Sequence, residues 1–173
     1  MTKELWELWL ESEERRNRDF NQYLKSKKIT KETETPALVK GHIEKADHNL
    51  KFLQATLGLK EFNDWAIVVS YYSIYQASLA LCALKGYSTK NHLATLLILI
   101  KDFYKIKLDR EDIAIVSKVA IEKEEVLDYI KNKAKRKEAN YSTKIFFDIK
   151  EAEGLQRKAI NFVNKVKEII DTY

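Results

Sequence analysis

The sequence is poor in the residues that make tight turns. Its 173 residues include four glycines and one proline, whereas leucine, isoleucine, alanine, lysine and glutamate are abundant. This composition favours long helices joined by short connections over sheets, which need many turns. The chain has no low-complexity spacer and is long enough to bury a hydrophobic core. We therefore predict an all-α protein.

Cysteine and histidine are also scarce. The single cysteine, Cys82, lies in the apolar stretch SLALCALK, where it forms no internal disulfide and is expected to be a small core residue. The three histidines, His42, His48 and His92, have no zinc-like spacing to cysteine or acidic partners. We expect His42 and His48 at the surface, and we predict neither a metal nor a cofactor.

The chain lacks long apolar runs. No uninterrupted run approaches the roughly 18 residues of a membrane span, and the N-terminus has no basic segment followed by an apolar one. Secretion and membrane insertion are therefore not expected. Together with the lone cysteine, this indicates a reducing, cytoplasmic location and no membrane partner.

Apolar residues recur at helical spacing through most of the chain, which predicts several amphipathic helices. The predicted helices cover residues 3–25, 37–57, 61–85, 90–104, 109–139 and about 148–173. Residues 25–36 have the polarity of a linker. This divides the chain into an N-terminal amphipathic helix with its linker, 1–35, and a helical bundle, 36–173. The N-terminal helix is expected to pack by its two ends or to dock its pair Trp6 and Trp9 on another surface.

Short connections make successive helices antiparallel, so residues 36–173 are predicted to form an up-down bundle of four to five core helices. In this arrangement the segment GYSTKNH, 86–92, and the segment KRKEANYS, 135–142, reach the same end of the bundle. Residues 131–144 contain six basic residues and one acidic residue, a net charge of +5. This window is either a solvated helix tip, an anion site or the remnant of a catalytic motif.

Residues at this end of the bundle suit a phosphate group. Ser88 and Thr89 can cap a helix that starts near Lys90, and the first N–H groups of a helix bind anions. Charge and hydrogen-bond donors come from Lys85, Lys90, His92 and the planar guanidinium of Arg136. Tyr71, Tyr72 or Tyr87 can stack or donate from a hydroxyl. The alternative is that these lysines are merely solvated and that the tyrosine pair belongs to the core.

From residue 37 onward the order of features resembles the HEPN family of small prokaryotic helical domains. The resemblance rests on four segments: HIEKADHNLKFLQATL, WAIVVSYYSIYQASLALCALKGYSTKNHLAT, RKEANYS and EAEGLQRKAINFV. The second is similar to the family's Tyr-Tyr helix, and the third to its Arg-x-x-Ala-Asp-Tyr segment, with Asn140 where Asp is usual. The resemblance implies a helical bundle that forms a homodimer, with a minimal nucleotidyltransferase as partner in a pair of the toxin-antitoxin kind.

Many HEPN members are metal-independent RNases whose site pairs an Arg with a His a few residues later. Arg136 matches the Arg, but Tyr141 stands where the His is expected. A phenol, with a pKa of about 10, is a poor general base near neutrality, whereas imidazole, at about 6.5, is a good one. The chain therefore resembles a nucleotide- or RNA-binding member with Lys85, Lys90, His92, Arg136, Tyr141 and Tyr72 as site residues. Two alternatives stay open: an RNase using Arg136 with His92, and a non-catalytic structural or protein-interaction bundle.

Overall fold

The computed structural model describes residues 3–33, 35–56, 59, 62–120 and 149–173. Most of these residues are helical, and the described part contains one small antiparallel sheet of two strands. The mainly helical fold predicted from the turn-poor composition is confirmed.

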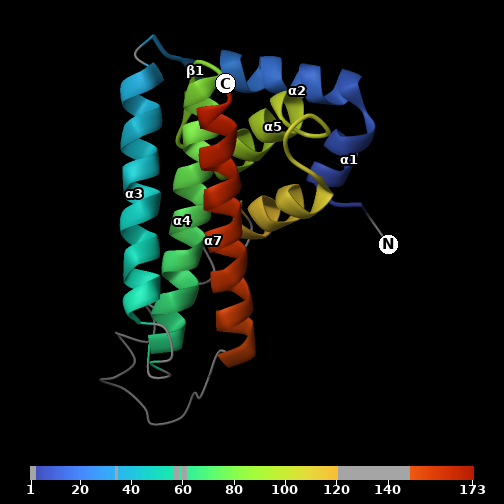
Figure 1. Cartoon of the computed structure of the whole chain (residues 1–173). Coiled ribbons are helices and arrows are strands. Elements are labelled where there is room, and N and C mark those ends of the chain that lie inside the picture. Colours follow the sequence, from blue (N-terminus) through green and yellow to red (C-terminus); the bar gives the residue numbers. More distant parts are fainter. Residues whose placement is uncertain (1–2, 34, 57–58, 60–61, 121–148) are drawn as a thin grey trace, which may run out of the picture.

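Three long helices form one side of the molecule. They are α3 (Thr35–Ala55), α4 (Asn63–Leu84) and α7 (Ile149–Asp171), and α4 packs against both of the others (Figure 1). The stretch Trp65–Leu84 is long and apolar enough to cross a membrane, but 67% of its most apolar window is buried. Such burial is typical of a core helix, and it explains why α4 is apolar on nearly every side. Cys82 lies in this core, as predicted.

Side-chain contacts fix the direction of α7. Lys167 pairs with Asp47 of α3 at 3.0 Å, and the amide of Gln156 donates to the Leu53 carbonyl of α3 at 2.8 Å. Residue numbers therefore rise along α3 as they fall along α7. Because the short connection between α3 and α4 makes those two antiparallel as well, α7 runs parallel to α4.

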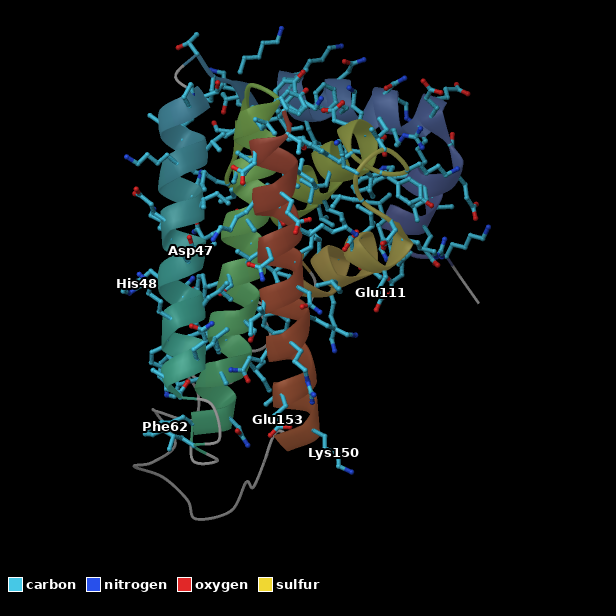
Figure 2. The ribbon with its side chains drawn as sticks, in the orientation of Figure 1. Asp47, His48, Phe62, Glu111, Lys150 and Glu153 are labelled. Carbon is cyan, nitrogen blue, oxygen red and sulfur yellow. The ribbon has the colours of Figure 1, made fainter. Side chains whose placement is uncertain are left out.

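The parallel α4 and α7 differ from the predicted up-down alternation, in which the last helix descends. Figure 2 places Phe62, which precedes α4, and Lys150 and Glu153 of α7 at the same end of the molecule. The alternation fails because α5 (His92–Asp102) has only 11 residues, and the helix over residues 110–120 lies across the long helices rather than along α4 (Figure 1). The remainder of the helix predicted over 109–139 lies outside the described residues.

The N-terminal segment forms two helices instead of one. α1 (Leu5–Glu11) and α2 (Glu13–Lys25) are separated at Ser12, whose side chain accepts the N–H of Arg15 and caps α2. Trp9 is wholly buried, and its Nε1 donates to Asp19 at 2.8 Å across the break. Trp9 is therefore a core residue rather than a docking residue for another surface. The break explains why the charged sequence between Trp9 and Phe20 stays out of the core.

The predicted linker contains a strand. β1 (Ile29–Lys31) pairs antiparallel with β2 (Tyr87–Thr89), with Ile29 opposite Thr89. Ile29 is 1% exposed and belongs to the same hydrophobic cluster as Trp9, Phe20 and the buried residues of α4, α5 and α7. The ribbon thus ties the N-terminal segment to the turn that leads into α5. Composition alone gave no sign of this pairing, because the two strands are far apart in the sequence.

Candidate functional site

The start of α5 lies at the end of the GYSTKNH turn. Asn91 is its N-cap, since its side chain accepts the N–H of Ala94 at 2.9 Å. The hydroxyl of Thr89 supports the cap by accepting the N–H of Asn91 at 3.0 Å. The prediction that Ser88 and Thr89 cap this helix is therefore wrong, because both belong to the extended strand β2. The positive end of the helix dipole still favours an anion here.

His92 is the first residue of α5 and packs on α4. Its ring lies against Tyr75, with ring centroids 4.1 Å apart and planes at 45°. His92 and Tyr75 are half-buried, whereas Lys90, two residues before His92, is exposed. Burial raises the pKa of the Tyr75 hydroxyl, although its hydrogen bond with Thr95 acts in the opposite direction. We refer to Tyr75, Lys90 and His92 as the His92 corner.

Lys85 lies away from this corner. It follows the last residue of α4, and its ammonium donates to the Tyr173 hydroxyl and lies over two rings, 4.7 Å from that of Tyr173 and 5.3 Å from that of Phe103. Phe103 is the residue that follows α5, while His92 begins it. An 11-residue helix spans about 16 Å. The structure therefore places Lys85 and His92 at opposite ends of α5 instead of joining them in one site.

The two tyrosines of the predicted pair have different roles. Tyr71 is 4% exposed and belongs to the core. Tyr72 is half-buried and lies one helical turn before Tyr75, so these two are neighbours on the surface of α4. Sequence analysis named Tyr72 but missed Tyr75, although the spacing within YYSIY could have indicated that both lie on one side.

Arg136 and Tyr141, the residues of the predicted KRKEANYS site, lie outside the described residues. The first residue of α7, Ile149, lies at the opposite end of α4 from Lys85, because α4 and α7 are parallel and Tyr173 contacts Lys85. The predicted meeting of KRKEANYS with GYSTKNH at one end therefore stays a prediction.

The other two histidines and the cysteine lie outside the His92 corner. His42 bonds the side chain of Gln76 at 2.8 Å between α3 and α4, and His48 is exposed on the outer side of α3 (Figure 2). Burial raises the pKa of the Cys82 thiol, which suits an inert core residue. Among the described residues, no group of three His, Cys, Asp or Glu side chains is arranged to hold a metal ion.

The His92 corner combines a cation, an imidazole and an aromatic surface at the start of a helix. These groups can hold a phosphate and stack a base, and the imidazole can move a proton. No family model, curated protein or solved structure matches the chain.

Proposed function

We propose that this protein binds the phosphate groups of a nucleotide or RNA at the His92 corner. The observation that carries the proposal is the packing of His92 on Tyr75 beside the exposed Lys90 at the start of α5. A single-stranded nucleic acid needs both a cation for its backbone and a ring for its bases, and the corner supplies both within a few residues. Tyr72 extends the same surface of α4.

The resemblance to the HEPN family supplies the remainder of the proposal. By that resemblance the protein acts as a cytoplasmic homodimer with a minimal nucleotidyltransferase as partner, in a pair of the toxin-antitoxin kind. Arg136 and Tyr141 would complete the site, and Tyr141 would donate a hydrogen bond to phosphate rather than act as a base. Lys85 is left out of the direct contacts, since its ammonium is held between Tyr173 and Phe103.

Binding is tested with a short fluorescent single-stranded RNA at low salt, where electrostatic contacts are strongest. We expect His92→Ala and Arg136→Ala each to weaken binding about tenfold, since each removes a charge-assisted or hydrogen-bonding contact. Arg157→Ala is the matched control, because Arg157 is 75% exposed on α7 and pairs only at 3.7 Å with Glu153. Equal affinity in all four proteins, or no binding by the wild type, would remove the proposal and favour a purely structural bundle.

A metal-independent RNase is the second candidate function. It is favoured by the half-buried position of His92, which leaves part of the side chain accessible. The same RNA, incubated in the presence of a metal chelator and separated on a gel, shows whether cleavage occurs. Cleavage that disappears in both His92→Ala and Arg136→Ala supports an RNase, whereas cleavage unchanged in both shows a contaminating nuclease.

A further inference from the structure

A second concentration of positive charge follows the other end of α5. A hollow of about 460 Å³ lies between residues 104–110 and α7. Four of its lining side chains are basic and one is acidic. We call it the basic hollow, and its lining residues are Tyr104, Lys105, Ile106, Lys107, Leu108, Asp109, Arg110 and Lys165.

A tight turn fixes the backbone of two of these lysines, Lys105 and Lys107. The carbonyl of Phe103 accepts the N–H groups of Ile106, Lys107 and Leu108 at 3.1, 2.9 and 3.0 Å. Lys105 has φ of 66°, in the left-handed region that few residues other than glycine adopt. The backbone therefore holds Lys105 and Lys107 on either side of Ile106, whose side chain is 73% exposed. The Lys105 ammonium lies over the Tyr104 ring, 5.6 Å from its centroid.

Acidic partners hold the other two cations in place. Arg110 pairs with Glu7 at 3.0 Å and stacks its guanidinium 5.4 Å from the Trp6 ring, and Lys165 pairs with Asp109 at 3.1 Å.

Among the described residues, two cations of the hollow have no acidic partner. Within the part of the chain that the structure describes, the ion pairs of this region are those of Arg110 with Glu7 and of Lys165 with Asp109 and Asp112. Lys105 and Lys107 take no part in them. Within the described residues the charges of Lys105 and Lys107 are therefore not offset by an ion pair, and a multiply charged anion would be attracted to both.

We propose that the basic hollow binds an oligophosphate chain, either free or carried by a nucleoside. Its volume lies in the range of small-ligand sites, which is roughly 300–1,000 Å³. A chain of phosphates matches four cations spread over three elements better than a single phosphate does. The apolar surfaces of Tyr104 and Ile106 lie beside the charges and can contact a nucleoside. This site is separate from the His92 corner and does not depend on it.

The test is calorimetric titration of the full chain with tripolyphosphate at low salt. The double variant Lys105→Glu/Lys107→Glu should bind at least about tenfold more weakly than the wild type, because two of the four cations are reversed. Lys45→Glu/Lys51→Glu is the matched control, since both residues are exposed on α3 and the net charge changes equally. The neutral pair Lys105→Gln/Lys107→Gln should be intermediate, and thermal unfolding shows that each variant is folded.

Other outcomes overturn the proposal. The proposal is wrong if the wild type does not bind tripolyphosphate. It is also wrong if Lys45→Glu/Lys51→Glu loses as much affinity as Lys105→Glu/Lys107→Glu, because net charge alone would then explain the loss. If the wild type does not bind tripolyphosphate but the variant Lys105→Glu/Lys107→Glu loses RNA binding, the hollow is a nucleic-acid surface instead.

A nucleoside triphosphate distinguishes the two sources of the oligophosphate. Tighter binding than tripolyphosphate, reduced by Ile106→Ala, identifies a nucleotide, and equal binding identifies a free oligophosphate. His92→Ala tests the other site independently, because it should weaken RNA binding and leave tripolyphosphate binding unchanged.

Discussion

The two ends of α5 hold their basic residues in different ways. At its start, Lys90 is exposed and His92 rests on Tyr75, with Asn91 capping the helix between them. Beyond its end, Lys85 lies over the rings of Phe103 and Tyr173.

The loop after α5 continues this pattern with ion pairs. Lys165 bridges Asp109 and Asp112, and Arg110 pairs with Glu7. Three of the cations near this end thus tie α1, α4, α7 and the helix over 110–120 together. A basic residue is therefore informative about function only after its structural contacts have been accounted for.

The largest expected effect on the comparison between the two ends of α5 comes from removing the aromatic ring of Phe103, which follows the last residue of α5. Phe103 is 1% exposed, so Phe103→Ala should lower the free energy of unfolding by about 3–5 kcal/mol through lost burial and the cavity left behind. Urea denaturation measures the change. Ile106→Ala, three residues later but 73% exposed, should stay within about 0.5 kcal/mol of the wild type. Similar losses in the two variants would show that Phe103 is not a core residue.

A smaller effect is expected at the start of α5. Asn91→Ala removes the cap on the Ala94 N–H and should cost about 1 kcal/mol in the free energy of unfolding. Asn91→Ser should restore most of it, since serine caps helices nearly as well. Urea denaturation of the three proteins checks this. If alanine and serine destabilise equally, the loss comes from another contact of Asn91 than its cap.

The smallest expected effect is a pH dependence of stability that comes from Asp109, in the loop after α5. The backbone N–H of Asp112 donates to Asp109 and, with Lys165, lowers the pKa of Asp109 despite some opposing desolvation. A carboxyl with a lowered folded-state pKa stabilises the fold above its unfolded pKa of about 3.9, and this is lost as pH falls through the folded value.

Asp109→Asn should therefore destabilise the protein at pH 7 and converge with the wild type in acid. Because the Asp109 side chain is 64% exposed, the difference should be only a few tenths of a kcal/mol. Urea denaturation at a series of pH values measures it. A difference that does not change with pH would show that the Asp109 charge makes no contribution.

Most helices were predictable because their signals are local. The ranges predicted as 37–57, 61–85 and 90–104 are observed as Thr35–Ala55, Asn63–Leu84 and His92–Asp102. Helical spacing of apolar residues and the glycine after α4 lie within the segment itself. The break at Ser12 was missed because the apolar periodicity on each side belongs to different helices.

The candidate site was only partly predictable. Lys90 and His92 were named and lie together at the start of α5, whereas Lys85 was named but lies at its other end. Tyr75 was missed although its helical spacing from Tyr72 could have indicated it, and Lys105 was missed because it stands in no recognisable motif. His92 is seven positions after Lys85 in the sequence, but their distance in space depends on the strand β2 between them and on the course of α5.

The sequence by itself determined that this chain is helical, that α4 is its central helix and that Cys82 is buried, because each follows from local composition and periodicity. Only the tertiary structure decided that α7 runs parallel to α4, that residues 29–31 pair with residues 87–89, and which cations have structural partners. The physical reason is that these depend on contacts between residues distant in the chain, whose free energies no local pattern encodes.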